Sequence, residues 1–99
     1  MIFKVRKHKE DIEKLRNEVV RLIDESNEAI YKVVFYSLDE VQEIMNKVMD
    51  KWERSGKQGR PIDYASPEEV KVLHKIAKKL ASRSPAELLV EYRELFTSY

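Results

Sequence analysis

The chain contains no cysteine among its 99 residues. This absence excludes disulfides, zinc fingers and thiol nucleophiles, and we expect a reducing, cytoplasmic location. Long apolar runs are missing too, since the longest, such as 33–36, fall far short of the ~20 residues that a membrane span needs. The first three residues, Met1-Ile2-Phe3, lead into charges rather than into a secretory core. We therefore expect a soluble protein with no membrane partner.

No charge of one sign dominates, because 19 Lys and Arg residues face 18 Asp and Glu residues. This balance argues against a protein whose whole surface is adapted to nucleic acid. Hydrophobic residues make up 42% and charged residues 37%, a globular composition with a heavy charged coat. The abundance of Lys, Glu and Arg is thermophile-like. A chain of this length predicts a single domain over residues 1–99.

Glycine and proline are also scarce, with two and three residues respectively. Gly56, Gly59 and Pro61 fall close together, which predicts that residues 55–65 form the main loop. The other prolines, Pro67 and Pro85, each follow a serine. Proline suits the first position of a helix, because its missing N–H would have no partner there.

Three serines are each followed by a glutamate three residues later, which is the spacing of a capping box. The pairs are Ser37 with Glu40, Ser66 with Glu69, and Ser84 with Glu87. Each pair predicts the start of a helix.

Apolar residues recur every three or four positions in four segments, as on one face of a helix. We predict helices over 8–36, from Ser37 to the apolar stripe that ends at Trp52, over 67–81 and over 85–99. The run 24–28 is where the first helix could break, but we favour one continuous helix. Residues 1–7 are expected to form a flexible basic arm. The fold predicted is an all-α, compact bundle of about four helices, in which a short connection makes the last two neighbours.

Positive charge gathers in the second half, where nine basic residues between Lys51 and Arg83 face four acidic ones. Lysines on successive helical turns and a basic loop are typical of sequence-independent phosphate binding. The candidate residues are Lys57, Arg60, Lys71, Lys75, Lys78, Lys79 and Arg83. The alternative is that these lysines are only the solvated face of a helix, with those near its C-terminus favouring the helix dipole. Trp52 and Tyr64 could stack on bases, and His74 is expected to be exposed.

The first predicted helix carries a wide apolar stripe that a small bundle does not need to cover completely. We expect a protein interface at Val20, Tyr31, Val34 and Phe35, either in a homodimer or on a larger complex. The alternative is that the aromatic residues only turn the corner into the second helix.

No pattern indicates a metal or cofactor. The two histidines, His8 and His74, lie far apart in the sequence, and the glycines lack the context of a phosphate-binding loop. We therefore expect no metal, no cofactor and no small-molecule substrate.

The segments 13–24 and 59–64, followed by Glu68-Glu69-Val70, resemble the small helical chorismate mutases. That resemblance implies a helical enzyme that holds a dicarboxylate substrate with several arginines and a lysine inside the bundle. Arg16 matches the first of these arginines, while the Val33 region and Pro67 stand where two others are expected.

Three functions remain open on the sequence. We favour a small non-enzymatic accessory or adaptor protein of a replication or transcription complex, with protein contacts through its long first helix and weak phosphate contacts. The alternatives are a homo-oligomeric structural protein without a nucleic-acid role, and an enzyme of the chorismate-mutase type.

Overall fold

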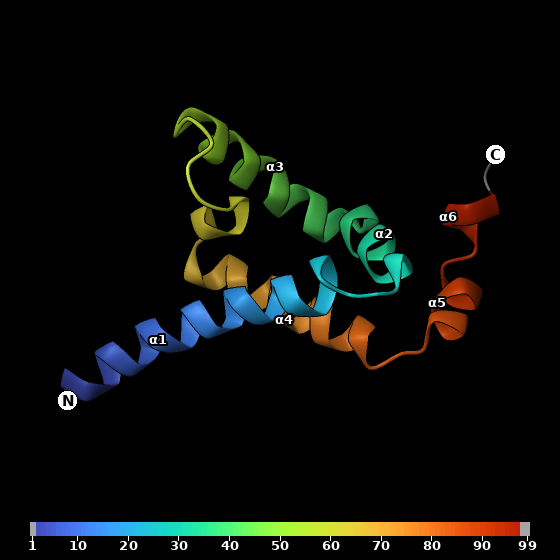
Figure 1. The fold of residues 1–99 in the computed structure, drawn as a ribbon, viewed down its shortest axis with the longest axis horizontal. Coiled ribbons are helices and arrows are strands. Elements are labelled where there is room, and N and C mark those ends of the chain that lie inside the picture. The colour runs from blue at the N-terminus through green and yellow to red at the C-terminus, as the bar shows by residue number, and fades with distance from the viewer. Residues whose placement is uncertain (1, 98–99) are drawn as a thin grey trace.

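Helices α1 (Ile2–Val19) and α4 (Pro67–Ala81) lie side by side along the base of the molecule (Figure 1). The structure is a computed structural model that describes the backbone of residues 2–97 and the side chains of residues 11–97. Helix α3 (Asp39–Arg54) crosses above this base, and α2 (Ala29–Ser37) connects the two levels. Helices α5 (Pro85–Glu91) and α6 (Glu94–Thr97) follow at the end of α4.

The all-α prediction is confirmed, because residues 2–97 form helices and no strand. The molecule measures 50 × 30 × 21 Å, and its radius of gyration of 14.9 Å exceeds the ~13 Å typical of a 100-residue domain. The excess arises because the beginning of α1 and the α5–α6 segment project from opposite ends of the body (Figure 1). None of the helices in the described part combines the length and the apolar character that crossing a membrane requires.

The prediction of one continuous helix over 8–36 was wrong. The α-helix ends at Val19 and passes into a π-helix, η1 (Val20–Asp24), in which the Glu25 N–H donates to the Val20 carbonyl at 2.9 Å. Ser26 then accepts a hydrogen bond from the Glu28 N–H at 3.1 Å. Serine and asparagine offer the backbone such local partners in place of helical ones, so the chain turns before α2 begins.

Two of the three predicted capping boxes are confirmed. The Ser66 hydroxyl accepts the Glu69 N–H at 3.2 Å, and the Glu69 carboxylate accepts the Ser66 N–H at 2.8 Å. Ser84 and Glu87 repeat this arrangement with the same distances. Helices α4 and α5 therefore begin where the sequence indicated.

The box predicted at Ser37 was wrong. Ser37 is the last residue of α2, and its hydroxyl donates back to the Val34 carbonyl at 2.8 Å. The extended residue before α3 is Leu38, which carries no side-chain cap. Because Ser37 is bound within α2, its hydroxyl is not available to the first turn of α3.

The last predicted helix, 85–99, is interrupted within its described part, since α5 ends at Glu91 and α6 begins at Glu94. Tyr92 adopts φ −111° and ψ 28°, outside the α region. The turn allows both Tyr92 and Leu95 to pack against the main core. Packing against the body thus takes precedence over continuation of the helix.

The core contains two adjoining groups of apolar side chains. The larger one unites η1, α2, α3, α4 and α5 and is centred on Ile23, Phe35 and Leu73, each at most 1% exposed. The smaller one joins Ile12 of α1 to Val48 of α3 and Val70 of α4. These contacts fix the rotation of α4 about its axis, which decides the direction of its polar side chains.

The predicted main loop is partly ordered by a 3-10 turn, η2 (Pro61–Tyr64). Ile62 and Ala65 are buried and hold this turn against the body. Gly59 precedes it with φ +72°, and a Cβ there would lie 3.1 Å from the Asp63 carboxylate. Only glycine meets both conditions without strain.

Candidate nucleic-acid interface

Four lysines of α4 project from the outer side of the helix. Apolar residues at three- and four-residue spacing turn inward, namely Val70, Leu73, Ala77 and Leu80. The intervening lysines, Lys71, Lys75, Lys78 and Lys79, are exposed. Since Ser66 and Pro67 fix the start of the helix and its core residues fix its rotation, the direction of the lysine row follows from the local sequence.

None of these four ammonium groups is paired with a carboxylate in the part of the chain whose side chains are described. The carboxylate contacts found there involve arginine or His74 and no lysine. Lys71 and Lys78 stand seven residues apart, about 10 Å along the helix. The row therefore offers positive charge along two turns, with no carboxylate at ion-pair distance among the described side chains and with Glu18 near enough to Lys78 to feel its charge.

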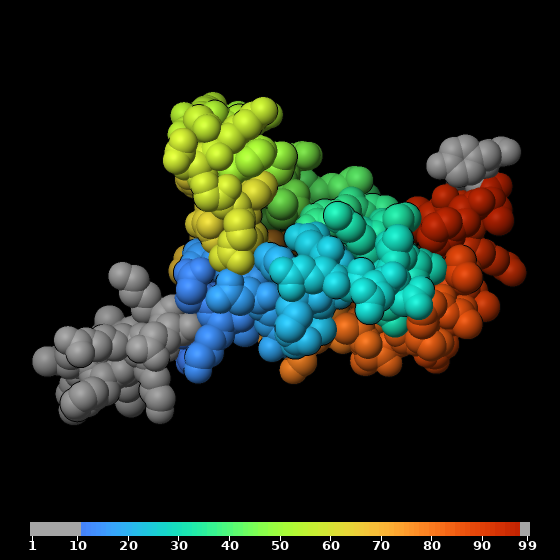
Figure 2. Space-filling model, viewed as in Figure 1, coloured from blue at the N-terminus to red at the C-terminus, as the bar shows by residue number. Residues whose placement is uncertain are grey.

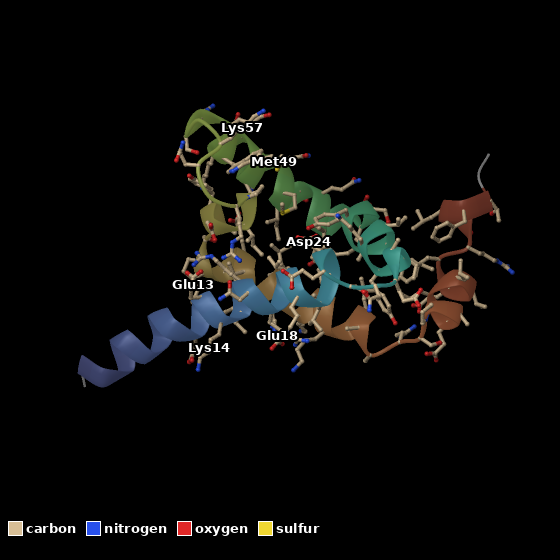
Figure 3. All side chains as sticks on the ribbon, viewed as in Figure 1. Glu13, Lys14, Glu18, Asp24, Met49 and Lys57 are labelled. Carbon is tan, nitrogen blue, oxygen red and sulfur yellow. The ribbon has the colours of Figure 1, made fainter. Side chains whose placement is uncertain are left out.

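Lys14 of α1 and Arg21 of η1 lie beside the row, and neither was predicted as a site residue. Glu18 of α1 reaches across to α4 with its carboxylate and also contacts Arg21, and Figure 3 shows Lys14 and Glu18 pointing to the same side. The sequence did carry the signal, because 14, 18 and 21 have helical spacing. We call Lys14, Arg21, Lys71, Lys75, Lys78 and Lys79 the basic face.

Five described carboxylates lie near these residues: Asp11 and Glu18 on α1, Glu68 on α4, and Asp39 and Glu40 on α3, which line a surface hollow with Lys79. Glu18 is occupied, since its carboxylate contacts His74 Nε2 at 2.6 Å and Arg21 at 3.8 Å. The hydrogen bond with His74 holds the pKa of Glu18 below its ordinary value. The surface thus keeps an excess of positive charge.

His74 was expected to be exposed, and this expectation was wrong. Only 16% of its side chain is exposed, because it lies between α1 and α4 with Glu18. Its partner stands 56 residues earlier in the chain, so helical spacing within α4 alone could not reveal the contact.

Arg60 was predicted to contact phosphate, but the structure places it in a network with the chain's own acceptors. Its guanidinium donates to Asp63 at 2.8 Å and to Asn17 at 2.8 Å, and it lies 3.4 Å from Glu13. The hydrogen bonds with Asp63 raise the pKa of Arg60 and lower that of Asp63. This guanidinium is already neutralised, so we do not include it in the basic face.

Lys57 lies apart from the lysine row, and Arg83, just after the end of α4, is engaged in an ion pair. Lys57 belongs to the loop after α3, on the opposite side of the molecule from Lys14 and Glu18 (Figure 3), and its ammonium lies 5.9 Å from the centroid of the Trp52 ring. Arg83 is paired with Glu91 of α5. The structure therefore brings together the α4 lysines but not the other three predicted residues.

The two aromatic residues proposed for base stacking instead hold the loop. The Trp52 indole N–H donates to the Gly59 carbonyl at 2.9 Å, and the Tyr64 hydroxyl donates to the Gln58 carbonyl at 2.8 Å. Both rings are half-buried. Their positions are explained by closure of residues 55–60 onto the end of α3.

The predicted protein interface needs correction at two residues. Val34 and Phe35 are 0% and 1% exposed and belong to the main core, because the break after η1 turns them inward. Tyr31 is half-buried, and its hydroxyl donates to the Arg83 carbonyl. Val20 is half-buried and lines a surface cavity together with Phe35.

Comparison of the chain with protein-family models, curated proteins and solved structures gave no significant match. Among the described residues, no group of three histidine or carboxylate side chains is arranged to hold a metal ion.

Proposed function

We propose that this chain is a small non-enzymatic accessory protein that binds the phosphate backbone of nucleic acid through its basic face. The observation that carries this proposal is the row of exposed α4 lysines that are unpaired within the described residues, with Lys14 and Arg21 beside it. Cations of this kind bind phosphates by releasing counterions and read no base sequence. The binding is therefore weak, salt-dependent and independent of sequence.

The first test replaces Lys71, Lys75 and Lys78 together by glutamine. Glutamine keeps the length and helix propensity of the side chain but removes its charge. With labelled duplex or single-stranded DNA at about 50 mM salt, we expect the triple variant to bind roughly tenfold or more weakly than the unaltered chain, because three phosphate contacts are lost.

A matched control replaces Lys32, Lys47 and Lys51, which are exposed on α2 and α3, by glutamine. This control changes the net charge equally while leaving the basic face intact. Its affinity should stay within about twofold to threefold of the unaltered chain. Equal losses in both triple variants would show a general charge effect and contradict the assignment of the basic face.

The enzyme alternative is less well supported by the geometry. Arg16, the residue that matches the mutase pattern, donates to Glu13 at 3.1 Å and to the Ala65 carbonyl at 2.9 Å. Arg60 is bound to Asp63 and lies near the same Glu13. Both guanidinium groups thus bind acceptors of the chain itself, and only the buried Nε of Arg16 lacks a hydrogen-bond partner among the described residues.

A further inference from the structure

An apolar cavity of about 360 Å³ opens on the side of the molecule away from the basic face. It lies between η1, α2, α3 and η2, and Figure 2 shows a recess between the yellow segment after α3 and the light-blue end of α1. Its walls are mainly apolar and include Val20, Phe35, Met45, Met49 and Ile62. This volume lies within the range of ligand sites and suffices for a few apolar side chains.

Two features of the cavity wall favour the binding of apolar side chains from another segment. Val20 and Asp24 come from the π-helix, a rare conformation that occurs often at functional sites. Met45 and Met49 provide unbranched side chains that adapt to the shape of a ligand. Met49 is 36% exposed, so the cavity is reachable from outside.

The cavity wall carries one carboxylate, Asp24, and one guanidinium, Arg60. Asp24 accepts a hydrogen bond from the Tyr36 hydroxyl at 2.8 Å through Oδ1, and its other oxygen has no hydrogen-bond partner among the described residues. Around Arg60, the carboxylates of Glu13, Glu25 and Asp63 add to this charge. Among the described residues, Glu13 and Asp63 are paired with the guanidinium groups of Arg16 and Arg60, which leaves Asp24 and Glu25 as the acidic excess. The rim therefore favours an apolar segment flanked by cations.

The first residues of this chain have that chemistry. Ile2, Phe3 and Val5 supply apolar side chains of suitable size. Lys4, Arg6, Lys7 and Lys9 supply the flanking cations, with no acidic residue before Glu10. The segment 2–9 and the cavity are thus complementary in both polarity and charge.

This segment does not reach the cavity of its own chain while α1 is intact. Phe3 precedes Val19, which lines the cavity, by sixteen residues in the same α-helix, so it lies about 24 Å away along the axis. In Figure 1 the beginning of α1 projects away from the body. Occupation of the cavity by this segment therefore requires another molecule.

We propose that the cavity binds the N-terminal segment of a second copy of this chain. A two-fold axis would place each segment in the cavity of the other copy, which gives an isologous dimer with two equivalent contacts. This proposal does not depend on nucleic-acid binding, and its test uses the full chain without nucleic acid.

Cross-linking tests the contact directly, because the chain has no cysteine of its own. Lys4→Cys places a thiol beside Phe3, and Met49→Cys places one at the cavity. When the two single variants are mixed and oxidised, we expect a disulfide-linked heterodimer, identified by its mass. The control pairs Lys4→Cys with Lys47→Cys, an exposed position on another side of α3. Equal yields from the two mixtures, or no heterodimer in the first, would overturn the proposal.

Light scattering over a dilution series gives a second readout that does not alter the core. The unaltered chain should form a dimer that dissociates on dilution, and Phe3→Asp should raise the dissociation constant at least tenfold. Val90→Asp, at a position 72% exposed on α5, is the matched control and should behave as the unaltered chain. A monomer at all concentrations, or a dimer unaffected by Phe3→Asp, would refute the N-terminal contact.

Discussion

Two adjacent valines in α2 have opposite environments, since Val34 is 0% exposed and Val33 is 49% exposed. Val34→Ala removes two buried methyl groups and leaves a cavity, so we expect a loss of about 2 kcal/mol in the free energy of unfolding. Val33→Ala should cost less than about 0.5 kcal/mol. Urea denaturation measures both.

This pair also tests the correction of the predicted interface. Had Val34 faced a partner and Val33 the core, the two losses would be exchanged. A larger loss for Val33→Ala would therefore contradict the rotation of α2 in the structure.

The free energy of unfolding should depend on pH through the single carboxylate of Asp63. Its pKa is lowered by the hydrogen bonds with Arg60, so its stabilising effect is present above the unfolded pKa of about 3.9 and is lost as the pH falls through the folded pKa. Asp63→Asn keeps the shape but removes the charge. The side chain is 36% exposed, and with screening by water we expect a loss of only about 1 kcal/mol at pH 7.

The difference between Asp63→Asn and the unaltered chain should shrink as the pH falls through the lowered pKa of Asp63, because the protonated side chain no longer carries a charge. Urea denaturation at several pH values gives this difference. A constant difference over the whole range would show that the charge of Asp63 does not contribute.

At the scale of elements, Ser66 and Ser37 are the same residue type in two different positions: Ser66 caps the start of α4, whereas Ser37 ends α2. Ser66→Ala removes the acceptor of the Glu69 N–H and should cost about 1 kcal/mol. Ser37→Ala removes only a bond to the carbonyl of Val34 within α2, and we expect less than about 0.5 kcal/mol. The two free energies of unfolding, measured in urea, should differ in this order. Equal costs would mean that Ser37 does cap α3.

Signals that involve neighbouring residues predicted the elements well. The start of α4 follows from Ser66, Pro67 and Glu69. The position of its lysine row follows from the spacing of the buried apolar residues that lie between the lysines. The prediction of a continuous first helix was wrong because it relied on the apolar periodicity of 8–36. The hydrogen bond between Ser26 and the Glu28 N–H favours a turn there instead. The interruption at Tyr92 depends on contacts with the core, which no local pattern reports.

Contacts between distant segments limited the prediction of the site. Arg60 meets Asn17 and Glu13 across 43 and 47 residues, and His74 meets Glu18 across 56. From the sequence, Arg60 was predicted to be a cation available for phosphate. In the folded chain its guanidinium instead binds Asn17, Glu13 and Asp63. The exposure of the α4 lysines followed from the sequence, because exposure on an amphipathic helix is a local property, and their contact with phosphate stays a prediction.

At the scale of the whole molecule, the basic face and the cavity lie on different sides. Lys14 and Glu18 point to one side of α1, while Met49 and Asp24 lie toward the other (Figure 3). A protein contact in the cavity would therefore leave the basic face accessible. In the proposed dimer, two basic faces would act on one polyanion, and linked sites of this kind bind more tightly than single ones.

The central claim is that the basic face binds phosphates, and the salt dependence of duplex DNA binding tests it most directly. For the unaltered chain, the logarithm of the association constant should fall with the logarithm of the salt concentration with a slope of about −3 or steeper. Each phosphate contact contributes about −0.9 to this slope. The triple change of Lys71, Lys75 and Lys78 to glutamine should reduce the slope by about 2.7 units. No binding at low salt, or a slope that this variant leaves unchanged, would contradict the account.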